Sequence, residues 1–132
     1  MKVIDSSAVA KYLNGEKNWE AAAEVLDEGC VSLELAVEES ANSLWKRVHR
    51  RELSGDQAKR LLSEFTGALP FVVEDPRGLY VPALEVASNL DVAFYDALFL
   101  ALAKEKELPL VTSDSAQAEA AKKLGLGVEL IE

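Results

Sequence analysis

Three aspartates in this sequence stand where a carboxylate could do chemistry rather than simply face solvent. Asp5 directly follows an apolar segment near the N-terminus, and Asp114 closely follows another near the C-terminus. Asp96 is the only side chain between positions 92 and 103 that is neither apolar nor aromatic. Carboxylates that meet without cations repel one another and raise each other's pKa values. A hard divalent cation removes that repulsion, and a site made of oxygen ligands favours Mg²⁺ or Mn²⁺.

Each of these aspartates also has a simpler structural explanation. Asp is a preferred N-cap residue, so Asp5 and Asp114 could each merely begin a helix. A carboxylate in an apolar helix needs compensation, and an Arg or Lys from elsewhere could supply it for Asp96. For each residue alone, the structural explanation therefore stays open. The functional explanation gains weight only if the acids converge on one place.

Composition argues against several other chemistries. His49 is the only histidine and Cys30 the only cysteine, which does not support a zinc site, a disulfide or a histidine-activated nucleophile. We expect Cys30 to be a buried structural thiol. The net charge of −9 argues against general affinity for nucleic acids, because Lys and Arg carry phosphate binding. It does not exclude a nucleic-acid substrate, since metal ions held by acids change the local charge.

Short apolar segments alternate along the chain with segments of helical periodicity. The expected strands lie at 2–4, 30–31, 71–73, 110–112 and 128–131. The expected helices run from Asp5–Ser7 to Asn14–Gly15, over 19–28, from Ser32 to beyond Val48, from Ser54 to beyond Phe65, over 79–90, over 91–104, and from Ser113 or Asp114 to Gly125. Ser54 and Gln57 have the spacing of a capping box.

Strands that alternate with helices indicate a parallel sheet covered by helices on both faces. In that class, ligands bind outside the carboxyl ends of the strands. Asp5 and Asp114 should therefore lie at the same edge of the sheet. The stretch Asp91–Lys104 is apolar on nearly all sides, so we expect a helix buried at the centre of the domain, with Asp96 in its middle.

The expected third helix carries acids first and cations later. Glu39, Ser43, Lys46 and Arg50 fall on one helical face, which is most often a solvated surface. The functional interpretation is an acidic end directed at a metal, followed by a basic strip that could hold phosphates. Glu38 is an alternative to Glu39, because it flanks the apolar stripe and should be the more buried of the two.

Length indicates one domain spanning residues 1–132. No apolar run approaches the roughly 20 residues that a membrane-spanning helix needs. The N-terminal residues do not form the apolar core of a signal peptide, so we expect an intracellular protein.

Four segments, VIDSSAVA, EESANSLWKR, FYDALFLALA and LVTSD, occur in this order over the whole chain. Together they resemble the PIN-domain family, in particular the VapC-type toxin ribonucleases of prokaryotic toxin–antitoxin pairs. The resemblance implies catalytic, metal-binding acids and polar residues lining their site: Asp5, Glu39, Asp96 and Asp114, with Ser6, Asn42 and Thr112. Ser40 departs from the family pattern, which often has an apolar residue after the helix acid. The choice between Glu38 and Glu39 therefore stays open.

The resemblance also implies a fold, an activity and partners. The fold would be a three-layer α/β/α PIN-like nuclease domain with a central parallel sheet of about five short strands. The activity would be Mg²⁺- or Mn²⁺-dependent endonucleolytic cleavage of single-stranded or looped RNA in the cytoplasm. The expected partners are a small antitoxin protein and a second copy in a homodimer, with no membrane. Candidate RNA-phosphate contacts are Lys46, Arg47, Arg50 and Arg51, and candidate exposed partner contacts are Trp19, Trp45, Phe65 and Tyr80.

Three other classes of protein share some of these features. A phosphoacceptor receiver domain would show paired acids after its first strand, where Asp5 stands alone. A haloacid-dehalogenase-type phosphatase would need a second aspartate where Ser7 stands. A PIN fold that serves as an interaction module, with weak or no nuclease activity, remains the main alternative. Metal-dependent cleavage of RNA would distinguish it from a nuclease.

Overall fold

Five short strands form a single parallel sheet in the order β3-β2-β1-β4-β5. They are β1 (Lys2–Ile4), β2 (Cys30–Leu33), β3 (Val72–Glu74), β4 (Leu110–Thr112) and β5 (Val128–Leu130). The structure is a computed structural model that describes residues 1–132. The three-layer α/β/α fold with a parallel central sheet, expected from the sequence, is confirmed.

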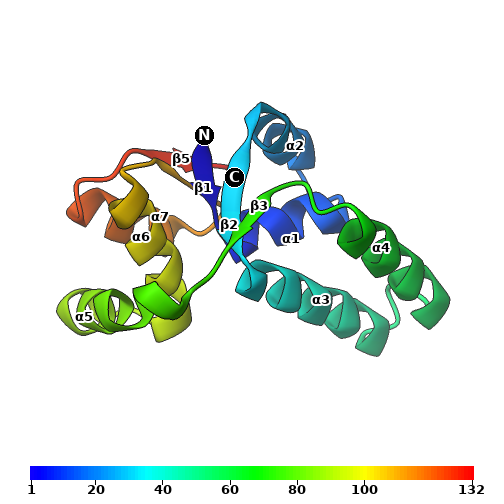
Figure 1. Ribbon diagram of the computed structural model, residues 1–132. Coiled ribbons are helices and arrows are strands. Elements are labelled where there is room, and N and C mark those ends of the chain that lie inside the picture. The colour runs from blue at the N-terminus through cyan, green and yellow to red at the C-terminus, as the bar shows by residue number, and fades with distance from the viewer.

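Seven α-helices and one 3-10 turn connect the strands. The first set is α1 (Ser6–Asn14), α2 (Trp19–Glu28), α3 (Glu34–His49) and α4 (Gly55–Gly67). The second set is η1 (Arg77–Leu79), α5 (Tyr80–Leu90), α6 (Phe94–Lys106) and α7 (Ser115–Lys123). The chain adds strands outward on one side of β1 and then returns to add them on the other. Because crossovers between parallel strands are right-handed, the two sets cover opposite faces of the sheet, as Figure 1 shows.

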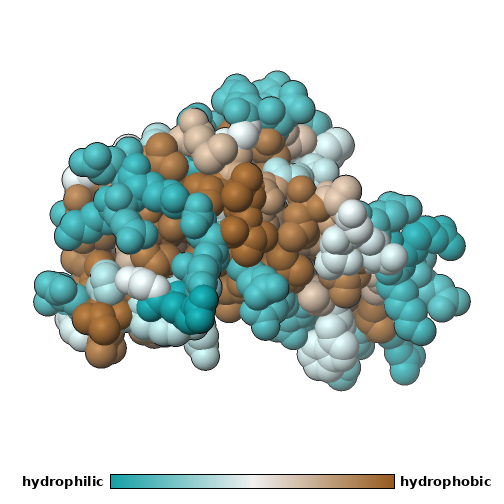
Figure 2. All heavy atoms as spheres, viewed as in Figure 1, coloured by the Kyte–Doolittle hydropathy of each residue, from teal (hydrophilic) through white to brown (hydrophobic).

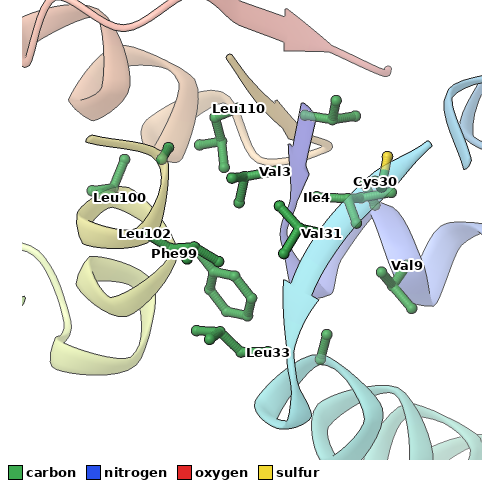
Figure 3. Packing of buried hydrophobic residues seen from close by; sticks show 14 of the residues in the cluster. Val3, Ile4, Val9, Cys30, Val31, Leu33, Phe99, Leu100, Leu102 and Leu110 are labelled. Atoms are coloured by element: carbon green, nitrogen blue, oxygen red, sulfur yellow. The ribbon is translucent and has the colours of Figure 1, made fainter. Parts of the chain in front are cut away.

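Helix α6 lies at the centre of the hydrophobic core. Its residues Ala97–Ala103 are all buried, which confirms the prediction of a helix that is apolar on nearly all sides. Figure 3 shows the Phe99 ring facing Val31 and Leu33 of β2. Ile4 points to the other face of the sheet, where Val9 of α1 lies. The side chains of the strands therefore bind both helical layers together, as expected when both faces of a sheet are covered.

Side-chain caps fix where three of the helices begin. Asp5 caps α1 by accepting one backbone N–H through its carboxylate, and Asp114 caps α7 by accepting two. Ser54 Oγ accepts from the Gln57 N–H, and Gln57 Oε1 accepts from the Ser54 N–H, which confirms the predicted capping box. Each cap uses donors that the first turn of a helix leaves unpaired.

The start of α3 and the start of α6 differ from prediction. Ser32 does not begin α3: strand β2 continues to Leu33, pairing with β3, and Ser32 Oγ donates to the Ile4 carbonyl oxygen at 2.6 Å. Helix α6 does not begin near position 91. Asp91 has a left-handed backbone (φ 54°) that ends α5, and the helix resumes only at Phe94.

The surface differs between the regions of the molecule. Figure 2 shows hydrophilic residues over α4 and hydrophobic residues over the edge strand β3, where Val72 and Val73 are exposed. Cys30 is buried, as expected, and burial raises the pKa of its thiol to about 11. No single helix is long and apolar enough to cross a membrane; Arg77–Leu90 and Phe94–Lys106 reach that length and composition only as a pair bent by 113°.

Candidate functional site

Asp5 lies between β1 and α1, caps α1 and is almost fully buried, with 4% of its surface exposed. Its Oδ1 accepts hydrogen bonds from Ser7 Oγ at 2.7 Å and from the Ala8 N–H at 3.2 Å. Ser7 Oγ in turn accepts from the Ser113 N–H at 2.8 Å and lies 3.1 Å from Thr112 Oγ1. Hydroxyl groups therefore tie the carboxylate at the end of β1 to the end of β4.

The environment of Asp5 disfavours its charged form. Burial raises the pKa of this carboxyl from 3.8 to about 6, and the nearby charge of Asp96 adds to the rise. Hydrogen bonds from Thr112, Ser7 and the Ala8 N–H act in the opposite direction, because they stabilise the carboxylate. No ion pair joins Asp5, since the six salt bridges of the protein all involve other acids. Its negative charge is therefore incompletely compensated.

Asp114 lies at the same edge of the sheet, two residues beyond β4. Its Oδ1 accepts from the backbone N–H groups of Ala116 at 2.8 Å and Gln117 at 3.3 Å. Its own N–H donates to Thr112 Oγ1 at 3.1 Å. The second carboxylate oxygen makes no hydrogen bond, and the side chain is exposed. Capping a helix and offering an oxygen to a ligand are compatible roles for this residue.

Asp96 is not buried in the middle of α6, and that part of the prediction is wrong. It lies in the first turn of the helix and is exposed, because α6 begins only at Phe94. Partial loss of hydration raises the pKa of its carboxyl first, followed by the charges of Glu39 and Asp114. Gln117 Nε2 donates to the Asp96 carbonyl oxygen at 2.9 Å and joins α7 to the start of α6. A position at a helix N-terminus favours the negative charge.

Glu39 and Glu38 lie next to each other on α3 but face different surroundings. Ser6 Oγ donates to Glu39 Oε1 at 2.7 Å, which places Glu39 beside the start of α1 and therefore beside Asp5. Glu38 instead lines a cavity of about 540 Å³ together with mainly apolar side chains, including Tyr80 and Phe94. Both glutamates are exposed, so neither is buried against the apolar stripe of the helix. The geometry brings Glu39, not Glu38, to the edge of the sheet where Asp5, Asp96 and Asp114 lie; we call these four acids the acidic edge.

The remaining predicted site residues divide into two groups. Ser6 and Thr112 lie within the hydrogen-bonded network of the acidic edge, and Thr112 is fully buried. Asn42 is exposed on α3, and no side-chain hydrogen bond joins it to the acids. The predicted phosphate contacts lie farther along α3, where Lys46, Arg47 and Arg50 line a separate polar cavity. Arg51 does not line that cavity.

The side chains of the acidic edge have the ligand atoms that a hard divalent cation prefers, but they do not converge on a single point in this structure. Two helix-capping acids, Asp5 and Asp114, together with Glu39 of α3 and Asp96 of α6, supply only oxygen ligands. No three acidic, histidine or cysteine side chains lie close enough together to hold one ion as they stand. Glu39, Asp96 and Asp114 are exposed, so their carboxylates have room to turn toward a cation. The unrelieved repulsion at Asp96 and the raised pKa of Asp5 are what such a cation would remove.

Comparison with known proteins connects this edge to a family. The PIN domain family model matches residues 2–123. The chain belongs to the PIN-domain family. Ribonuclease VapC3 of Pyrobaculum aerophilum is 34% identical over 122 residues, which cover 89% of this chain and 92% of that protein. Ribonuclease VapC1 of Mycobacterium tuberculosis is 34% identical over 127 residues, covering 89% of each chain.

Solved structures agree with this PIN-domain architecture. The crystal structure of PAE2754 from Pyrobaculum aerophilum superposes with a TM-score of 0.73 at 25% identity, covering 96% of this chain and 87% of that one. The crystal structure of FitAcB from Neisseria gonorrhoeae has a TM-score of 0.66 at 20% identity, covering 97% and 96%, and supports the fold alone.

Two residues of this PIN domain that hold the acidic edge together were not singled out as part of a site from the sequence. Ser7 is the hub of the hydroxyl network, and Gln117, only 3% exposed, fastens α7 to α6. Only weak features of the sequence point to these two residues. Ser7 is one of two serines after the first acid, and Gln117 is a polar residue on the buried face of an alanine-rich helix.

Proposed function

We propose that this chain is a metal-dependent endoribonuclease that cleaves single-stranded or looped RNA, acting in the cytoplasm as the toxin of a toxin–antitoxin pair. The observation that carries the proposal is the gathering of four carboxylates at the carboxyl edge of the sheet, in a chain that matches named ribonucleases over most of its length. In parallel α/β sheets, this edge is where ligands bind.

In this proposal, Asp5, Glu39, Asp96 and Asp114 hold one or more Mg²⁺ or Mn²⁺ ions. When bound, such an ion lowers the pKa of a water molecule and offsets charge on the leaving oxygen. Ser7 and Thr112 hold the Asp5 carboxylate in place, and Ser6 holds Glu39. No histidine or cysteine nucleophile is required, in agreement with a sequence that has one of each, away from this edge.

Incubation of purified protein with a mixed single-stranded RNA would test the nuclease proposal. We expect internal cleavage with Mg²⁺ or Mn²⁺ and none with a chelator. The Asp5→Asn variant, purified in the same way, controls for contaminating ribonuclease. Absence of metal-dependent cleavage by the wild type would favour an interaction module instead.

We further propose that a small antitoxin protein inhibits the enzyme by covering the acidic edge. A partner arginine could pair with one of the exposed carboxylates in a bidentate manner, since none has a cation of its own. The complex should therefore compete with metal or RNA. A tight inhibitory complex in which Asp96 and Asp114 remain open to solvent and metal would contradict this mode of inhibition.

We also propose that the protein forms a homodimer. Of the four aromatic residues expected to be exposed, Trp19, Trp45 and Tyr80 are exposed, whereas Phe65 is buried at 6% and that expectation is wrong. Helix α5 presents Tyr80 with Val81 and Leu84, which are 78% and 59% exposed, and this apolar surface suits a second copy. Light scattering should show a dimer at micromolar concentration, and a monomer there would contradict the proposal.

A further inference from the structure

A cavity of about 360 Å³ lies between the end of α1 and the second half of α3, and every residue that lines it is polar. We call it the polar pocket; its lining residues are Asn14, Glu16, Ser43, Lys46, Arg47, Arg50 and Glu52. The other large cavities all include apolar side chains. An all-polar lining indicates a site for a charged or strongly hydrated group rather than for an apolar ligand.

Asn14 fixes the geometry of the polar pocket. Its Nδ2 donates to the Ala10 carbonyl oxygen and to Ser43 Oγ, both at 2.9 Å. Its Oδ1 accepts from Arg47 Nη1 at 3.0 Å. Arg47 is thereby held in one orientation, and only 27% of its side chain is exposed. A guanidinium that is already ordered loses less conformational entropy when it binds a ligand.

The polar pocket gathers positive charge in a chain of net charge −9. Lys46, Arg47 and Arg50 outnumber the two acids that line it, Glu16 and Glu52. Glu52 occupies both arginines: its Oε2 lies 2.7 Å from Arg50 Nε, and its Oε1 lies 3.9 Å from Arg47 Nε. Its side chain is 49% exposed, and exposed ion pairs of this kind contribute little to stability. An incoming phosphate can therefore replace the Glu52 carboxylate.

The polar pocket lies on the same helix as one of the acids at the sheet edge. Glu39, Ser43 and Lys46 share one face of α3, and Lys46 lies about 10 Å from Glu39 along the helix axis. Arg50 directly follows the last residue of the helix. An RNA strand that places one phosphate at the acidic edge and runs along α3 would reach the pocket a few nucleotides away.

We propose that the polar pocket is a second phosphate subsite for single-stranded RNA, with Arg47 as its anchor and Glu52 as the carboxylate that the phosphate displaces. The inference rests on the proposed nuclease function, because it takes the same RNA as the ligand. It distinguishes among the predicted contacts: Lys46, Arg47 and Arg50 hold phosphate, whereas Arg51 does not line the pocket.

Binding of a fluorescently labelled single-stranded RNA oligonucleotide would test the subsite. Anisotropy is measured over a range of salt concentrations in the cleavage-deficient Asp96→Asn protein. Adding Arg47→Gln should weaken binding about tenfold and reduce the slope of log K against log salt by about 0.7, the value for one phosphate of a single strand. Arg50→Gln should weaken it less, because that side chain is more exposed and lacks the bond to Asn14. Arg60→Gln, the same change on α4 outside every described cavity, is the matched control.

Glu52→Gln provides the decisive contrast, because it removes the competing carboxylate. We expect it to tighten RNA binding several-fold and to steepen the salt dependence. A merely structural role for this network would give the opposite sign, and weaker binding in Glu52→Gln would overturn the proposal. So would Arg47→Gln or Arg50→Gln proteins that bind RNA as the Arg60→Gln protein does.

The test also separates this inference from the nuclease proposal. Wild-type protein that cleaves RNA with Mn²⁺, combined with unchanged binding in Arg47→Gln, would overturn the subsite alone. Wild-type protein that fails to cleave but shows the expected order of affinities, with Glu52→Gln tightest and Arg47→Gln weakest, would overturn the nuclease function alone.

Discussion

The two ends of helix α3 carry opposite charges, and only the charges at one end are paired with a counter-ion of the chain. At its first half, Glu39 belongs to a set of carboxylates that form no ion pair with any cation of the chain. At its other end, Arg47 in the last turn and Arg50 directly after the helix already have a counter-ion in Glu52. The helix dipole favours the cations of the last turn, Lys46 and Arg47, but its effect does not extend to Glu39, which lies beyond the first turn. It does not explain why only the cations are paired.

The presence of a counter-ion at one end of α3 and its absence at the other predict how each region responds to metal ions and to salt. Hydroxyl and backbone donors hold the carboxylates of the acidic edge, and no cation of the chain forms an ion pair with them. In the polar pocket Glu52 already pairs with Arg50, so under our proposal a phosphate would have to displace Glu52. The first region should therefore respond strongly to divalent metal, and the second should respond mainly to ionic strength.

Asp96→Asn should have the largest effect and should abolish metal-dependent cleavage while the protein stays folded. The substitution keeps the shape of the side chain but removes a charge that a cation needs. Asp91→Asn is the matched control, because Asn tolerates the left-handed backbone there (φ 54°) and the residue ends a different helix. Wild-type cleavage by Asp96→Asn in Mg²⁺ or Mn²⁺ would show that the acidic edge is not the reaction centre.

Two neighbouring residues of α3 sharpen the comparison further. Glu39→Gln should lower the cleavage rate by orders of magnitude, whereas Glu38→Gln should change it little, because only Glu39 reaches Ser6 and the other acids. Rates on one RNA substrate, with folding checked by circular dichroism, measure both. The reverse order would assign the helix acid to Glu38.

The pH dependence of stability without metal should report on Asp5. Its pKa is about 6 in the folded protein against 3.8 in an exposed carboxyl, so the folded state holds a proton that the unfolded state has lost. The resulting stabilisation is complete below about pH 4 and is lost as pH rises through about 6. At pH 7.5 with a chelator, Asp5→Asn should therefore be more stable than wild type by up to about 3 kcal/mol.

Urea unfolding at pH 4 and at pH 7.5 measures this difference. The gain from Asp5→Asn should shrink markedly at the lower pH, and Mg²⁺ should stabilise the wild type more than the variant. An equal effect of the substitution at both pH values would show that Asp5 is not charged at a cost in the folded protein.

Ser7→Ala should have the smallest effect, a loss of about 1 to 3 kcal/mol of stability. It removes the hydroxyl that serves the Asp5 carboxylate and the Ser113 N–H, and groups left unpaired in a part-buried place are costly. Ser6→Ala is the control, because the Ser6 hydroxyl donates only to an exposed glutamate, which water can hydrogen-bond in its place. Thermal unfolding of both variants compares them, and equal melting temperatures would contradict the central role of Ser7.

The sequence alone determined the architecture and much of the acidic edge, because both depend on local rules. Apolar runs alternating with helical periodicity require a parallel sheet, and in such a sheet Asp5 and Asp114 must share an edge. The capping box at Ser54 and Gln57 involves residues three positions apart, so it too could be predicted from sequence. The resemblance to the PIN-domain family was likewise visible from segments in order along the chain.

Only the tertiary structure decided where Asp96 lies and how the charges of α3 are paired. The break at Asp91 depends on how α5 packs against α6, and it places Asp96 in an exposed first turn instead of a buried middle. Ser7 accepts a hydrogen bond from Ser113, 106 residues away in the sequence, and Asn14 accepts one from Arg47, 33 residues away. Periodicity describes the face of one element at a time, whereas contacts between distant elements are fixed by the packing of the whole domain.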